Sequence, residues 1–145
     1  MKRENWTLIA ICSAKNRGLS PVQLQKTLFL MGQELPQEVG YPYYNFVPYN
    51  YGPFDAQIYT DAESLAKQGL VAIESSSAKR WSKYLATSFG LKSAEQIKQE
   101  VSPCALQYLQ TVIDWVQDLS FQQLVRAIYK KYPQYRANSV FQDNG

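Results

Sequence analysis

Residues 38–53 interrupt an otherwise helical sequence pattern, and this interruption restricts the possible folds most. The segment contains Pro42, Pro48 and Pro53, and a proline both breaks a helix and lacks the N–H group that a strand ladder needs. Six of the 11 tyrosines lie between Tyr41 and Tyr59, so a disordered segment would leave many aromatic rings in water. We therefore predict a long ordered loop here, with one short strand at residues 44–47.

The sequence before and after this loop carries helix signals. Ser20 is a suitable N-cap, Pro21 suits the first helical position and Gln23 completes a capping box, so a helix is predicted to begin there and to stop at Pro36. The apolar stripe of this helix leaves Lys26 pointing away from the core. Further helical segments are predicted at residues 4–15, 55–68 with Asp55 as N-cap, 93–100, a long stretch from Pro103, and 120–132 with a second capping box.

Two strands are predicted directly after the helix at 55–68. They comprise residues 70–73 and 81–87, and the polar residues 75–80 form the turn between them. A hairpin that follows helix–loop–helix is the element order of a winged helix. We predict a mainly α fold with a small antiparallel β-hairpin: one winged-helix-like domain over residues 1–139 with extra C-terminal helices, and a loose tail at 140–145.

Composition excludes several kinds of chemistry. The 145 residues include no histidine, which excludes a Ser-His-Asp triad, a Cys-His pair and any metal site containing histidine. Cys12 and Cys104 are far apart in sequence, so no zinc ribbon or Cys-x-x-Cys redox centre is present. No apolar run approaches the length of a membrane span and no secretion signal follows Met1. We expect a cytoplasmic protein that is not an enzyme and that has no cofactor or metal.

The aromatic loop is the first candidate binding site. Tyrosine combines apolar area with a hydroxyl group at low entropic cost, so a dense group of tyrosines is typical of a protein-binding surface. The alternative is that these rings fill a gap between helices. The predicted partner-binding residues are Tyr41, Tyr43, Tyr49, Tyr51, Gly52, Pro53 and Phe54.

Gly52 also has a predicted structural role. A glycine between Tyr51 and Pro53 is expected to hold a positive φ, or to let an aromatic ring pack against bare backbone. Replacing Gly52 with alanine is therefore predicted to cost about 1–3 kcal/mol of stability.

The predicted hairpin turn is the second candidate site. No acidic residue lies between Glu74 and Glu95, and cations alternate with rings there, which favours contact with phosphates and bases. The alternative is a solubilising turn. The preceding helix carries a net charge of −2, which disfavours binding in a DNA major groove. The candidate nucleic-acid-binding residues are Lys79, Arg80, Trp81 and Lys83, and a C-terminal set of cations extends the candidate surface: Arg126, Lys130, Lys131 and Arg136.

Three sequence motifs together resemble a known family. They are residues 24–30 (LQKTLFL), 46–54 (FVPYNYGPF) and 58–71 (IYTDAESLAKQGLV), and the run 132–135 (YPQY) adds to them. The combination resembles the YwgA-like bacterial winged-helix proteins and, more distantly, the Panacea antitoxin domain, over residues 20–139. Thr27 stands where Panacea-like sequences usually have leucine, which favours the YwgA-like branch.

This resemblance implies a winged-helix module of a bacterium or phage. Panacea-like domains are associated with neutralising toxins by direct contact, in mobile and defence-linked gene neighbourhoods. The expected function is therefore non-enzymatic binding of a protein partner, with a toxin or defence component as one possibility. The alternative function is a nucleic-acid-binding protein or transcriptional regulator that uses the basic hairpin turn.

Overall fold

The computed structural model describes residues 1–75 and 82–142. Residues Lys79, Arg80 and Trp81, three of the candidate nucleic-acid-binding residues, lie outside the described residues. The elements follow one another as α1 (Arg3–Ser13), η1 (Lys15–Arg17), α2 (Pro21–Glu34), α3 (Pro36–Val39), β1 (Val47–Tyr49), β2 (Gly52–Phe54), α4 (Gln57–Lys67), β3 (Val71–Ser75), β4 (Ser82–Ala86), α5 (Ser88–Lys98), α6 (Pro103–Asp118), α7 (Phe121–Lys131) and η2 (Pro133–Arg136).

Helix starts follow the local capping signals closely. Both predicted capping boxes are present, with Ser20 accepting a hydrogen bond from the Gln23 N–H at the start of α2 and Ser120 accepting one from the Gln123 N–H at the start of α7. Helix α5 begins earlier than residue 93, because Thr87 caps it through the Gly90 N–H at 2.9 Å. Helix α4 is assigned from Gln57, one residue later than an Asp55 cap implies, but the Asp55 carboxylate does accept a hydrogen bond from the Gln57 N–H at 2.9 Å, whereas the Ala56 side chain caps nothing.

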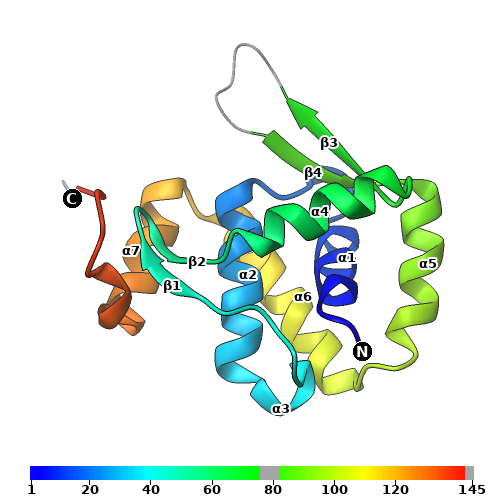
Figure 1. Ribbon diagram of the computed structural model, residues 1–145, viewed down its shortest axis with the longest axis horizontal. Coiled ribbons are helices and arrows are strands. Elements are labelled where there is room, and N and C mark those ends of the chain that lie inside the picture. Colours follow the sequence, from blue (N-terminus) through cyan, green and yellow to red (C-terminus); the bar gives the residue numbers. More distant parts are fainter. Residues whose placement is uncertain (76–81, 143–145) are drawn as a thin grey trace.

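The core forms around α1, which is buried along one continuous stretch from Trp6 to Ser13. Helices α2, α4, α5 and α6 all pack against α1, and α6 also packs along α2 (Figure 1). The buried apolar side chains of these helices belong to a single cluster that extends to α7. The predicted mainly α class with a small β-hairpin is therefore confirmed.

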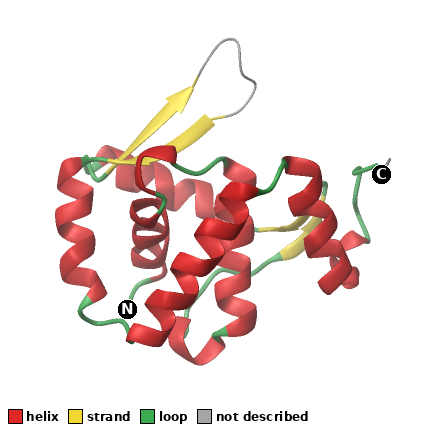
Figure 2. Ribbon diagram, turned by 180° about the vertical axis from the view of Figure 1, so that it is seen from behind, coloured by secondary structure: helices red, strands yellow, loops and turns green. Residues whose placement is uncertain are grey.

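The strands form two separate antiparallel hairpins (Figure 2). In β3–β4, Val71 pairs with Ala86 and Ser75 with Ser82, and the hairpin projects from the helical body. Leu19, just before α2, forms a bridge with Tyr84 of β4. The winged-helix assignment stays a prediction: α1, α2, α4, β3 and β4 follow one another in the expected order, but α3 and the hairpin β1–β2 stand between α2 and α4.

The hairpin β1–β2 lies within the segment that was predicted as a loop with one strand at 44–47. That prediction was wrong, because two three-residue strands pair with Pro48 directly opposite Pro53. Neither proline has an N–H group, so this pair forms no ladder hydrogen bonds. The bonded and non-bonded pairs of an antiparallel ladder alternate, so prolines at facing non-bonded positions are compatible with strands.

Candidate partner-binding surface

Helix α2 is hydrogen bonded to the hairpin β1–β2, through its residues Gln25 and Lys26. The Lys26 ammonium donates to the Pro53 carbonyl at 3.2 Å. The Gln25 side chain donates to the Asp55 carbonyl at 2.9 Å and accepts from the Asp55 N–H at 3.0 Å. These bonds fix strand β2 against α2 at neighbouring backbone positions.

Lys26 itself is buried, with 3% of its surface exposed. The prediction that it points away from the core was therefore wrong. Burial away from water disfavours the charged ammonium and lowers the pKa of Lys26 to about 7. Nothing in the sequence identified this burial, because it arises from the tertiary packing of strand β2 against α2.

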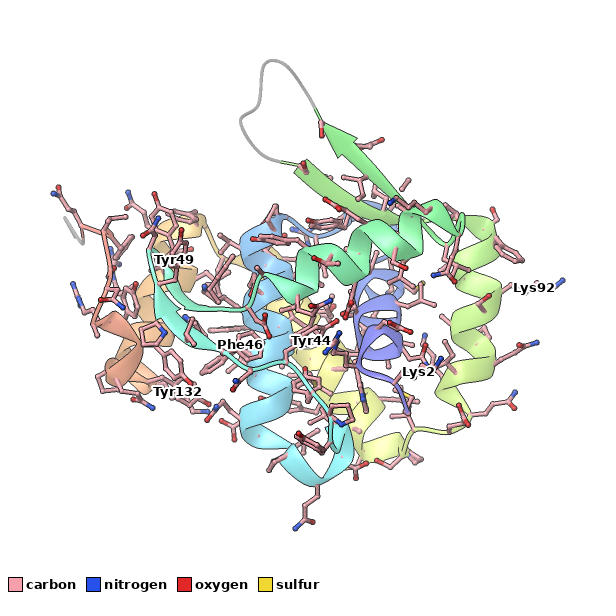
Figure 3. The ribbon with its side chains drawn as sticks, viewed as in Figure 1. Lys2, Tyr44, Phe46, Tyr49, Lys92 and Tyr132 are labelled. Carbon is pink, nitrogen blue, oxygen red and sulfur yellow. The ribbon has the colours of Figure 1, made fainter. Side chains whose placement is uncertain are left out.

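Several aromatic side chains of the loop do fill a gap between helices, as the alternative interpretation stated. The Phe29 ring of α2 makes edge contacts with Phe46 at 5.3 Å and with Tyr132 at 4.9 Å. Tyr44 is buried, and its hydroxyl donates to Asp61 at 2.6 Å. Figure 3 shows Tyr44 and Phe46 along the segment that leads to β1.

Three of the predicted partner-binding residues also serve this internal packing. The Tyr43 hydroxyl donates to the Leu28 carbonyl at 2.6 Å and its ring lies against Gly32, so it joins the loop to α2. Gly52 and Pro53 of strand β2 are themselves buried. The prediction that Gly52 and Pro53 face a partner was wrong, because this part of β2 faces Lys26 of α2 and Tyr129 of α7. Gly52 does hold a positive φ, of +105°, as predicted.

The opposite side of the hairpin exposes apolar side chains. Val47 is 51% exposed, Tyr49 48% and Tyr51 41%, and Phe121 at the start of α7 is 45% exposed. Tyr49 stacks on Phe54 at 4.7 Å, and Tyr51 makes an edge contact with Phe121 at 5.0 Å. We call the set Val47, Tyr49, Tyr51, Phe54 and Phe121 the aromatic surface.

Tyr41 lies apart from this surface. It is 98% exposed, but its neighbour Pro42 lines a cavity with residues 1–4 at the N-terminus. In Figure 3 the labelled Tyr49 lies at the far end of the hairpin from Lys2, near α7. The structure therefore brings Tyr49, Tyr51 and Phe54 together and leaves Tyr41 outside.

A cavity of about 300 Å³ adjoins the aromatic surface. Phe121 belongs to both, since it contacts Tyr51 and also forms part of the cavity wall. The start of α2 and the start of α7 enclose the cavity, which is lined by Ser20, Pro21, Val22, Gln23, Leu119, Ser120, Phe121 and Leu124. The two capping boxes marked these helix starts, but nothing in the sequence placed them side by side.

The C-terminal segment lies against the hairpin turn. The Val140 N–H donates to the Asn50 carbonyl at 3.0 Å, and the Ser139 hydroxyl donates to the same carbonyl at 3.2 Å. The Tyr129 hydroxyl of α7 donates to the Ser139 oxygen at 2.6 Å. Val140, which was assigned to a loose tail, is therefore hydrogen bonded to the domain.

The candidate cationic residues that the structure describes differ in their surroundings. Lys83 is exposed on β4, directly opposite Glu74 of β3. The Lys131 ammonium donates to the Glu34 carboxylate at 2.6 Å. This hydrogen bond and a second one from the Tyr132 hydroxyl hold the pKa of the Glu34 carboxyl below its usual value. Arg136 lies over the Tyr129 ring at 5.3 Å. Among the described residues of the β3–β4 hairpin, the candidate cation Lys83 therefore faces an acidic residue, Glu74.

Comparison with known proteins adds no family. No protein-family model matches the chain, and a search of curated proteins finds no significant match. The YwgA-like resemblance stays a prediction.

Among residues 1–75 and 82–142, none of the helices combines the length and apolar character that crossing a bilayer requires. In the same residues, no group of three or more acidic or cysteine side chains is arranged to hold a metal ion.

Proposed function

We propose that this chain is a non-enzymatic interaction module that binds a protein partner through the aromatic surface, in the cytoplasm of a bacterium or of a phage-infected cell. The single observation that carries the proposal is the exposure of Val47, Tyr49 and Tyr51 on one short hairpin, whose turn reaches exposed Phe121 of α7 through the ring contact between Tyr51 and Phe121. Exposed apolar side chains gathered in this way on a folded domain are typical of a protein-binding site.

The support beneath the surface strengthens the proposal. Val47, Tyr49 and Phe54 project from a hairpin whose backbone is hydrogen bonded to α2 and to the C-terminal segment. Rings held in position lose little conformational entropy on binding, which favours affinity. A toxin or a defence component is the partner class that the YwgA-like and Panacea resemblance suggests.

Nucleic-acid binding is the alternative function. Lys83 stands opposite Glu74 across the hairpin, which reduces the positive charge that this part of the surface offers to phosphates. The aromatic surface contains exposed Val47 and Phe121, which have no hydrogen-bonding group for a base edge or a phosphate. These observations favour a protein partner.

Co-purification with the proteins encoded next to its gene tests the proposal. The tagged full chain is compared with the double variant Val47→Ser, Tyr49→Ser, and retained proteins are identified by mass spectrometry and remeasured as purified pairs by calorimetry. Phe89→Ser is the matched control, because Phe89 is 61% exposed on α5, outside the aromatic surface.

We expect the parent chain and the control to retain the same partner in equal amounts, and the double variant to lose it. Retention by the double variant would refute the proposed surface. Binding of a 20-base-pair duplex at low salt, with no protein retained, would favour the alternative function instead.

A further inference from the structure

Strand β3 has one edge that pairs with no other strand of the described residues. We infer that this edge pairs with the same strand of a second copy of the chain, antiparallel and with Ile73 opposite Ile73, and that the chain thereby forms a weak symmetric dimer. The inference goes beyond the proposed function, because β3 contributes no residue to the aromatic surface and the two proposals can fail separately.

The hydrogen bonds of Tyr84 show which side of β3 is open. The Tyr84 N–H donates to the Leu19 carbonyl at 2.8 Å, and the Tyr84 carbonyl accepts from the Leu19 N–H at 3.0 Å. Both groups of Tyr84 therefore point away from Ile73, its partner across the hairpin. In an antiparallel ladder such a pair is non-bonded on both strands, so the Ile73 N–H and C=O point away from β4. By the same alternation the groups of Val71 and Ser75 face the open edge.

Strand β3 lacks the features that usually protect an edge strand. Proteins block such edges with proline, a bulge, lysine or an inward-pointing charge. The five residues of β3 pair with β4 without a bulge, and their one charged residue, Glu74, is exposed. Hairpin β1–β2, by contrast, has a proline in each strand. Figure 2 shows the β3–β4 hairpin standing out from the helical body, where a further strand can approach.

The start of β3 is already held in place within one chain. The Thr87 N–H donates to the Leu70 carbonyl at 3.3 Å, and the Thr87 hydroxyl donates to the Gly69 carbonyl at 2.6 Å. An added Cβ on Gly90 would lie 1.9 Å from the Leu70 carbonyl oxygen, so α5 packs directly on this backbone. Because the strand is ordered before it pairs, pairing costs little conformational entropy.

Bond direction and side chains together select one register for two copies. Ala72 and Glu74 face β4 with their backbone groups, so neither can be the centre of the pair, whereas a centre at Ile73 pairs the whole of 71–75. This register places Glu74 opposite Ala72 of the second copy, so no like charges face each other. On the other face the two β-branched Ile73 side chains meet beside the core, against which Ile73 packs. The strand is therefore complementary to itself, as a two-fold interface requires.

The oligomeric state of the full chain tests the inference. Five paired residues on each copy make a small interface, so we expect a dissociation constant on the order of 50 µM. Sedimentation velocity from about 5 to about 500 µM should show the dimer fraction rising with concentration. A monomer at every concentration would overturn the inference.

Ile73→Pro removes the outward N–H without removing a bond to β4, so the hairpin of each chain keeps its ladder. We expect this variant to weaken dimerisation by at least about tenfold. Ile73→Val is the matched control, because it keeps both the N–H and the β-branched side chain, and it should dimerise like the parent. Equal dimerisation of Ile73→Pro, with the fold verified by circular dichroism, would overturn the inference.

Two substitutions of exposed Ala72 give a second test, should the proline variant fail to fold. Ala72→Glu would face Glu74 of the second copy twice in the dimer, and we expect it to weaken dimerisation about fivefold. Ala72→Lys would face the same two carboxylates, and we expect it to strengthen dimerisation about threefold. Changes in the same direction for both variants would overturn the register.

A cross-linking experiment tests the register directly. Facing non-bonded residues have Cα atoms about 4.5 Å apart, which suits a disulfide. With exposed Cys104 replaced by serine, a mixture of Ala72→Cys and Glu74→Cys chains should form disulfide-linked dimers, and either chain alone should form far fewer. Equal cross-linking in all three samples would overturn the register and the inference with it.

The inference and the proposed function fail in different ways. The variant Val47→Ser, Tyr49→Ser leaves β3 unchanged, so it should dimerise like the parent even where it loses the protein partner. A foreign protein that the parent retains and Ile73→Pro loses, while the parent alone stays monomeric, would assign the edge of β3 to that protein and overturn the inference.

Discussion

The two hairpins are held in place in different ways. Hairpin β3–β4 pairs five residues on each strand and is joined to the segment before α2 by the Leu19–Tyr84 bridge, at the middle residue of β4. Hairpin β1–β2 pairs only three residues on each strand, two of them prolines facing each other, and depends on contacts from α2, α7 and the C-terminal segment. A short ladder is marginally stable alone, so the hairpin with the aromatic surface is ordered by its surroundings.

The largest effect is expected from Gly18→Ala, where the chain before α2 lies beside β4. Gly18 has a φ of +65°, and an added Cβ would lie 2.6 Å from the Tyr84 carbonyl oxygen. That oxygen accepts from the Leu19 N–H at 3.0 Å, so it cannot withdraw without disturbing the bridge. We expect a loss of about 3 kcal/mol in urea unfolding, from backbone strain and a weakened hydrogen bond together.

Gly69→Ala separates these two contributions. Gly69 has a φ of +79°, but an added Cβ would meet nothing within 4 Å. Its replacement should cost about 1 kcal/mol, because only the backbone conformation is unfavourable. Equal losses for the two variants would show that the close approach of Gly18 to the Tyr84 carbonyl contributes nothing to stability.

Gly52→Ala is expected to have the next largest effect, on β1–β2. Its φ of +105° is unfavourable for alanine, but the new Cβ would lie 3.4 Å from a Tyr129 ring carbon and 3.5 Å from the end of Lys26. Flexible side chains can shift by tenths of an ångström, so we expect about 2 kcal/mol, between the Gly69 and Gly18 variants. A change within about 0.5 kcal/mol of the parent would mean that the Tyr-Gly-Pro turn is not needed for stability.

The sequence predicts hairpin β3–β4 but not hairpin β1–β2, and the difference has a physical reason. Local signals are legible because they act within a few residues: Ser20 with Gln23 and Ser120 with Gln123 mark helix starts, and the apolar residues of β3 precede a polar turn. Pro48 and Pro53 indicate a loop until their pairing is known, and pairing is a tertiary property. The cavity and the burial of Lys26 are tertiary in the same way, so the aromatic residues could be found but their supports could not.

Replacing Lys26 tests the contact between α2 and the hairpin β1–β2. Burial lowers the pKa of Lys26 in the folded protein to about 7, against about 10.5 in the unfolded chain. Between these values the unfolded chain binds one more proton, so stability rises with pH by up to about 1.36 kcal/mol per pH unit. Lys26→Met removes this dependence, and we expect it to be about 1–2 kcal/mol more stable than the parent at pH 7.

The measurement is urea unfolding from pH 7 to 9.5, expressed as the difference between the variant and the parent. Burial raises the pKa of Tyr84 to about 12, and the difference removes this and other tyrosine contributions that both proteins share. Lys92→Met is the control, because Lys92 is exposed on α5. A parent whose stability does not change with pH relative to Lys26→Met would show that Lys26 reaches water.

Ser139→Ala is expected to have the smallest effect among the variants that test β1–β2, and it probes the third support of this hairpin. The Ser139 oxygen accepts from the Tyr129 hydroxyl at 2.6 Å and from the Phe141 N–H at 3.0 Å, while its hydroxyl donates to Asn50. Alanine removes this link between α7 and the hairpin turn, but the Val140 N–H still donates to Asn50, so we expect a loss of about 1 kcal/mol. Hydrogen exchange should accelerate at the Val140 amide, whereas replacing Ser64, which is exposed on α4, with alanine should change neither stability nor exchange at Val140. Unchanged exchange at Val140 would mean that the C-terminal segment holds itself, and that α2 and α7 alone order the hairpin which carries the aromatic surface.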